Sequence, residues 1–167
     1  MSLLTTKELK EQEVLQYAGK RNPLVCTEQE IESVFLFSQR RRIIWESYLT
    51  WRSAVTSQLH PVRFWLDGSF ITAKENPHDI DVVVVVAPDV YEQARCTAAD
   101  AIQPLFGHKV PGGFYRPCDG LVDAYMVTED SLELLEYWDN FWSSVNTKKQ
   151  YVSESIHKKR YLEVKWQ

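Results

Sequence analysis

A run of five valines near the middle of the chain constrains the fold more than any other feature. Val82–Val86 follow two aspartates, so that the segment from Asp79 reads DIDVVVVV. β-Branched residues favour strands, and a strand that is apolar on both of its faces is typical of one covered on both sides. The sequence therefore predicts a central, doubly covered strand over residues 79–86.

Capping and turn signals predict the other elements. Helices are predicted over 6–16, from 27 onward, over 38–59, over 88–105 and from 130 to about 141. Capping boxes are expected at Thr27–Glu30 and Asp130–Glu133, and Ser38 can cap the helix that His60-Pro61 ends. Strands are predicted over 62–66, 121–127 and 161–166, the last as an edge strand. The glycine- and proline-rich segment 107–117 is predicted to be a mobile loop.

This order of elements predicts one domain of the α/β (α+β) class, with a mixed β-sheet flanked by helices. A length of 167 residues suits one domain with a substantial core. We expect residues 1–26 to form an N-terminal arm with a short helix. Residues 27–167 would then form the domain, with its core at about 62–127.

Charge and cysteine content predict where the protein is located and what it binds. The formal net charge of −4 removes the usual reason to expect non-specific binding to duplex nucleic acid. No apolar stretch is long enough to span a membrane, and the N-terminus lacks the apolar core of a signal peptide. The three cysteines have neither disulfide nor zinc spacing, so a cytoplasmic protein without membrane contact is expected. The basic clusters at 40–42, 148–149 and 158–160 are interpreted as mostly solvated helix faces.

Three aspartates are the candidate catalytic residues. Asp79 and Asp81 alternate with Ile80, so both carboxylates project from one face of the predicted strand, with Cα atoms about 6.6 Å apart. Asp123 lies inside a later apolar strand, where a buried charge needs compensation. If the two strands pair side by side, the three carboxylates form a cluster, and a hard cation such as Mg²⁺ relieves their repulsion.

A Gly-Ser pair directly after the strand at 62–66 completes the pattern. Gly68 has no Cβ, so a phosphate can approach the backbone closely there. The Ser69 hydroxyl and the amides of the turn can then donate hydrogen bonds to phosphate oxygens.

These motifs resemble the nucleotidyltransferase superfamily typified by DNA polymerase beta. The resemblance lies in FWLDGSFITAKENPHDIDVVVVV followed by LVDAYMV, which covers residues 62–127. The family motif is a Gly-Ser turn, an Asp-x-Asp on a strand and a third carboxylate on a neighbouring strand. The loop 70–78 lacks the Ala-Arg-Gly start of many minimal bacterial members and looks more like a bacterial and phage branch of the superfamily.

The resemblance implies a nucleotidyltransferase fold and an activity. A nucleoside monophosphate would move from an NTP such as ATP to an acceptor hydroxyl on a protein, an RNA or a small molecule, with two Mg²⁺ ions, or Mn²⁺ in their place. Asp79, Asp81 and Asp123 match the metal ligands, and Gly68 and Ser69 match the phosphate-holding turn. Lys74 is grouped with the turn as nucleotide-binding, and the further candidate cations are His78, Lys148, Lys149 and Lys158.

Other interpretations of the same residues stay open. Asp79 can belong to a turn, and the aromatic group at 137–142 is more often core than a binding surface. If part of that group is exposed, it becomes a partner surface or a stack for the nucleobase. A second functional class is a catalytically weak or inactive binding module with the same fold, such as the antitoxin-like partner of a toxin protein. A protein partner or a homo-oligomer is open in either class. A third is nucleic-acid binding through the helix that carries Arg40–Arg42. The three carboxylates favour the enzyme.

Overall fold

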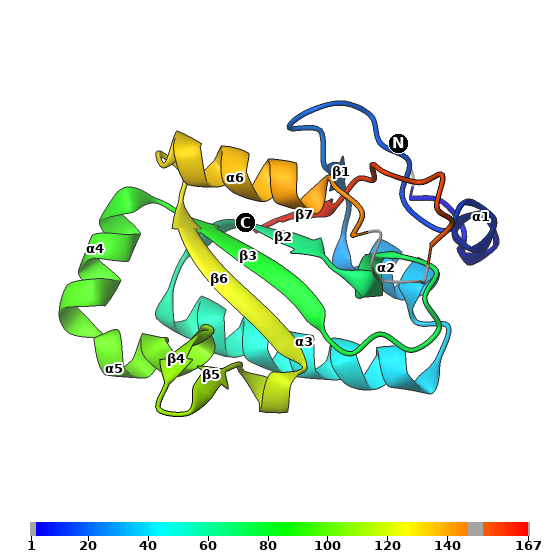
Figure 1. The fold of residues 1–167 in the computed structure, drawn as a ribbon. Helices are drawn as coiled ribbons and strands as arrows, with labels where there is room; N and C mark the ends of the chain where they lie inside the picture. The colour runs from blue at the N-terminus through cyan, green and yellow to red at the C-terminus, as the bar shows by residue number, and fades with distance from the viewer. Residues whose placement is uncertain (1–2, 147–151, 167) are drawn as a thin grey trace.

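The chain forms one mixed sheet with helices on both faces and a small hairpin beside it (Figure 1). A computed structural model describes residues 3–146 and 152–166. The helices are α1 (Thr6–Gln12), α2 (Glu28–Phe35), α3 (Gln39–Gln58), α4 (Pro88–Thr97), α5 (Ala99–Ile102) and α6 (Leu132–Trp142). The strands are β1 (Leu24–Val25), β2 (Pro61–Asp67), β3 (Ile80–Val86), β4 (His108–Val110), β5 (Gly113–Tyr115), β6 (Val122–Thr128) and β7 (Leu162–Lys165). Short 3₁₀ turns lie at η1 (Ser69–Ile71), η2 (Gln103–Leu105) and η3 (Cys118–Gly120).

The main sheet has the strand order β1-β7-β2-β3-β6. β3 pairs antiparallel with β2 and parallel with β6, while β7 pairs antiparallel with β2 and parallel with β1. The predicted α+β class with a mixed sheet is therefore confirmed. The prediction of an edge strand near the C-terminus is wrong, because β1, from the N-terminal segment, pairs with the outer side of β7.

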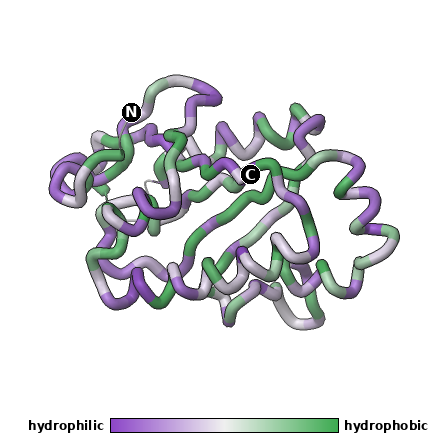
Figure 2. The backbone as a smooth tube through the Cα atoms, turned by 180° about the vertical axis from the view of Figure 1, so that it is seen from behind, coloured by the Kyte–Doolittle hydropathy of each residue, from purple (hydrophilic) through white to green (hydrophobic). Residues whose placement is uncertain are grey.

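The valine strand β3 is buried on both faces, as predicted. All five valines have zero exposure. Val82, Val84 and Val86 pack in the larger core with α3, and Val83 and Val85 pack in a smaller core with residues of α6. Figure 1 shows α3 and α6 on opposite sides of the sheet, and Figure 2 shows hydrophobic colouring along the central strands. Alternation along β3 therefore assigns Asp81 to the face that α6 covers.

Local capping signals predict most helix starts correctly. The Thr27–Glu30 capping box is present, with both reciprocal hydrogen bonds. Ser38 caps α3 by accepting a hydrogen bond from the Arg41 amide. The capping box predicted at Asp130–Glu133 is wrong, because the N-cap of α6 is Ser131 and its side chain makes no capping hydrogen bond.

Two predictions between β3 and β6 need correction. The helix predicted over 88–105 is divided into α4, α5 and η2, because Ala98 takes a non-helical conformation and Pro104 stands in the last turn. The predicted loop at 107–117 contains the antiparallel hairpin of β4 and β5. Gly112, with φ +84°, lies at the turn of this hairpin, where positive φ suits glycine.

The N-terminal segment contributes to the sheet and to the main core. Leu9 of α1 and Leu15 are buried, and β1 adds a strand beside β7. None of the helices in the described ranges combines the length and apolarity needed to cross a bilayer.

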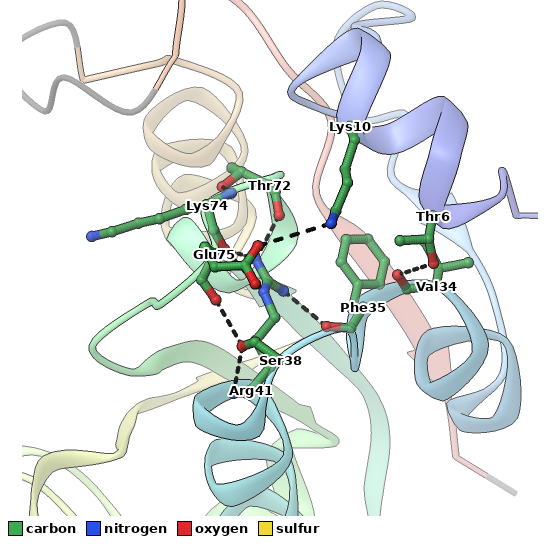
Figure 3. A network of polar contacts seen from close by, with 9 residues as sticks. All are labelled: Thr6, Lys10, Val34, Phe35, Ser38, Arg41, Thr72, Lys74 and Glu75. Atoms are coloured by element: carbon green, nitrogen blue, oxygen red, sulfur yellow. Dashed lines mark hydrogen bonds and ion pairs between the residues drawn. The ribbon is translucent and has the colours of Figure 1, made fainter.

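Arg41 is buried, which corrects the prediction of a solvated face for the cluster at 40–42. Its guanidinium donates hydrogen bonds of 2.6–3.1 Å to backbone carbonyls, those of Phe35, Phe70, Thr72 and Lys74. Figure 3 draws Arg41 with Phe35, Thr72 and Lys74. Burial lowers the pKa of Arg41 to about 10. Arg40 donates to the carbonyls of Pro77 and His78, so α3 holds the loop between η1 and β3. Arg42 is the exposed member of the cluster.

Candidate functional site

A row of three carboxylates crosses adjacent strands at one end of the sheet. In the register of the sheet, Asp81 of β3 pairs with Asp123 of β6 on one side and with Asp67 of β2 on the other. Paired residues on neighbouring strands point to the same face, and the strands lie about 4.8 Å apart. Asp67 and Asp123 are buried, whereas Asp81 is half-buried. We call these residues the carboxylate row.

The structure brings two of the three predicted aspartates into direct register. Asp81 and Asp123 are the neighbours that the sequence predicts. Asp79 lies just before β3 and is half-buried. It is within electrostatic reach of the site, because it contributes to the raised pKa of Arg116, although Asp123 is the larger cause.

The Gly-Ser turn packs against the row. Gly68 has φ +81°, and a Cβ at this position would collide with Asp81 Oδ2. A glycine is therefore needed both for the backbone conformation and for the close approach of the carboxylate. Ser69 begins η1 and is buried, and its carbonyl accepts a hydrogen bond from the Thr72 hydroxyl.

The remaining predicted cations lie elsewhere or outside the described residues. The Lys74 side chain points away from the Arg41 network (Figure 3), and Lys74 does not line the pocket at the carboxylate row. Lys158 is exposed, with its ammonium over the Tyr17 ring. His78 is exposed too. Lys148 and Lys149 fall outside the described ranges.

We expect Gly68→Ala to lower the free energy of unfolding by about 3 kcal/mol, from a positive-φ penalty of about 1 kcal/mol plus steric collision. Gly112→Ala is the matched control, because Gly112 has φ +84° and no heavy atom lies within 4 Å of the position that its Cβ would take. It should lose about 1 kcal/mol, the conformational penalty alone. Urea unfolding of both variants measures the difference, and equal losses would contradict the close contact between Gly68 and Asp81.

Sequence reasoning missed the buried ion pair between Asp67 and Lys159. Both side chains are 5% exposed, and Lys159 Nζ also donates to the Trp142 carbonyl at 2.9 Å. The interpretation of the cluster at 158–160 as a solvated face is therefore wrong for Lys159. The sequence could have indicated Asp67 as a site residue, since it ends an apolar strand directly before Gly68. Nothing in the sequence around Lys159 indicates that it pairs with Asp67.

A second cation, Arg116, lies beside Asp123. Arg116 Nε lies 3.3 Å from Asp123 Oδ2, and the Arg116 side chain is 43% exposed. Burial, followed by the Asp123 carboxylate, raises the pKa of Tyr125 to about 12. The other oxygen, Asp123 Oδ1, is buried and has no hydrogen-bond partner among the described residues. A buried carboxylate oxygen without a donor destabilises the folded state, and a cation or another donor that bound this atom would remove that penalty.

The oxygen atoms available at this site are of the type that a hard divalent cation prefers, namely carboxylate oxygens. Asp79, Asp81 and Asp123 supply such oxygens, and Asp123 Oδ1 is unsatisfied. Within the described ranges, no three acidic, histidine or cysteine side chains are already grouped closely enough to hold a metal ion. Asp81 and Asp123 are the best-placed pair for such an ion.

A pocket of about 550 Å³ opens over the carboxylate row. Asp67, Gly68, Asp81 and Asp123 line it. Aromatic residues of α6 also line it, namely Tyr137, Trp138, Phe141 and Trp142, which we call the aromatic wall. The expectation that this group lies mainly in the core holds for Trp142, which is buried, but Tyr137 and Phe141 are exposed.

A family match covers almost the whole chain. Residues 8–164 match the family described as "Family of unknown function (DUF6932)". No curated protein and no solved structure matches the chain. Because the match spans most of the residues, including every strand of the main sheet except the last residue of β7, the chain belongs to family DUF6932.

Proposed function

We propose that the protein is a metal-dependent nucleotidyltransferase that moves a nucleoside monophosphate from an NTP to an acceptor hydroxyl on a protein, an RNA or a small molecule. The observation that carries the proposal is the register of Asp81 with Asp123, with Gly68 against the Asp81 carboxylate. These residues match the nucleotidyltransferase motif. The mixed sheet with helices on both faces agrees with the corresponding fold.

Asp79, Asp81 and Asp123 would hold Mg²⁺ or Mn²⁺. Bound ions of this kind lower the pKa of an attacking hydroxyl and stabilise charge on a transferring phosphoryl group and its pyrophosphate leaving group. Gly68 keeps the turn free of a side chain where Asp81 approaches. Arg116 lies beside Asp123 with a partly exposed side chain, so its guanidinium can turn towards phosphate oxygens, which it can bind through two parallel hydrogen bonds.

A labelling experiment tests this function. The purified chain is incubated with each common NTP, labelled at the α-phosphate, with and without cell extract. We expect labelled product with at least one NTP, with Mg²⁺ required and EDTA abolishing it. Labelling without extract would show self-modification.

Thermal unfolding of the same protein gives a second test. Mg²⁺ and the active NTP together should raise Tm more than either does alone, since a ligand at about 100 times its Kd adds about 2.7 kcal/mol. An absence of both labelling and a Tm rise with every NTP would overturn the transferase proposal.

A second candidate function is a binding module, for example an antitoxin-like partner of a toxin protein. The exposed apolar side chains of α6 favour it, since Leu132 is 63% and Leu134 46% exposed. A chain that binds no NTP with Mg²⁺ but forms a stable complex with a protein or with itself would support this alternative. The nucleic-acid alternative has less support, because Arg40 and Arg41 donate hydrogen bonds to backbone carbonyls and Arg42 is the exposed member of the cluster.

A further inference from the structure

Two members of the aromatic wall, Tyr137 and Phe141, present accessible rings, whereas Trp142 is buried. Tyr137 is 54% and Phe141 61% exposed. Their rings are nearly parallel, with an interplanar angle of 5° and centroids 6.0 Å apart. Trp138 packs edge-on against both of them. Large exposed aromatic rings that line a pocket are a feature of ligand surfaces.

The wall is held in place from behind. Leu135 and Trp142 pack in the core between α6 and the sheet. Asp139, also on α6, is buried and accepts hydrogen bonds from the Tyr161 hydroxyl at 2.8 Å and from the Arg21 amide at 3.0 Å. Because α6 is anchored on its inner side, a ligand that stacks on the outer rings meets a preorganised surface.

The wall and the carboxylate row belong to the same pocket. Tyr137, Trp138 and Phe141 line it together with Asp81 and Asp123. A ligand that fills both parts needs a flat apolar group at one end. At its other end it needs a group that meets carboxylates through a bound cation. The volume of about 550 Å³ lies in the range of small-molecule sites.

We propose that the aromatic wall is the nucleobase site of the pocket, and that Tyr137 and Phe141 bind the base by stacking. This inference rests on the proposed transferase function, which supplies the NTP. Stacking on an aromatic ring uses the face that every base has, so it discriminates weakly between bases. Tyr137 and Phe141 therefore set affinity for the nucleoside part, while the carboxylate row meets the metal-bound triphosphate.

Calorimetric binding of Mg·ATP, Mg·GTP, Mg·CTP and Mg·UTP, beside Mg²⁺ with inorganic tripolyphosphate, separates the two parts of the ligand. Phe141→Ala and Tyr137→Ala should each weaken the binding of the NTPs about tenfold, which corresponds to about 1.4 kcal/mol for the lost base stack. Tripolyphosphate affinity should stay unchanged. Phe141→Tyr keeps the ring and should keep NTP affinity.

Leu132→Ala is the matched control, because Leu132 is equally exposed on α6 but does not line the pocket. It should change neither affinity. Unchanged NTP affinity in both ring variants, or equal losses for NTPs and tripolyphosphate, would overturn the nucleobase site while leaving the transferase proposal intact. Absence of NTP binding by the unaltered chain would overturn the transferase proposal and the nucleobase site with it.

Discussion

Replacing Arg41 with methionine should lower the free energy of unfolding by about 4 kcal/mol, because a buried group that loses its hydrogen-bond partner costs about 1–3 kcal/mol. The guanidinium is fully buried and serves a group of backbone carbonyls, those of Phe35, Phe70, Thr72 and Lys74. Methionine approximates the volume but offers no donor. Urea unfolding followed by circular dichroism measures the loss.

Arg42→Met is the control, since Arg42 is the next residue of α3 and is exposed. It should change stability by less than about 0.5 kcal/mol. Arg41→Lys should recover only part of the loss, because a lysine ammonium has three donors on a flexible stem and cannot reproduce the planar guanidinium fork. A loss below about 1 kcal/mol for Arg41→Met would show that water replaces the donor, against the burial that the structure gives.

The elements that can be predicted correctly from the sequence are those with short-range signals. Thr27 and Glu30 are three residues apart, and their reciprocal capping bonds need no distant partner. The valine run predicts a doubly buried strand whatever lies on either side of it, since no polar position is left to face water. Asp81 and Asp123 could be predicted as neighbours because each lies within an apolar strand, although their exact pairing is a property of the register.

The features that could not be predicted depend on contacts between distant parts of the chain. Lys159 meets Asp67 across 92 residues, and nothing near Lys159 distinguishes it from the solvated Lys158. Arg41 is buried because η1 and the loop after it fold over α3 and offer their carbonyls as acceptors. β7 is an inner strand because the N-terminal β1 adds beside it. Neither local charge nor hydrophobic periodicity predicts any of these contacts.

Asp81→Asn should reduce nucleotide transfer at least 100-fold, or by about 2.7 kcal/mol of transition-state stabilisation. Asp81 is the central member of the carboxylate row, in register with Asp67 and Asp123, so its loss removes the ligand shared across the site. The metal-free protein should not lose stability. Like charges on directly opposite residues of a sheet destabilise it, but Lys159 and Arg116 already offset the charges of Asp67 and Asp123, so removing the Asp81 charge is expected to change the free energy of unfolding by less than about 1 kcal/mol.

Asp100→Asn makes the same chemical change at an exposed residue of α5 and should leave labelling at the level of the unaltered chain. Lost transfer together with retained or increased metal-free stability identifies Asp81 as a ligand rather than a structural support. Unchanged labelling would remove Asp81 from the proposed metal site. A fall in metal-free stability of more than about 1 kcal/mol would assign the carboxylate a structural role, since an ordinary surface substitution stays within about 0.5 kcal/mol. The free energy of unfolding and the rate of nucleotide transfer therefore have to be measured on the same preparation, because a metal ligand and a structural residue differ in whether stability falls together with transfer.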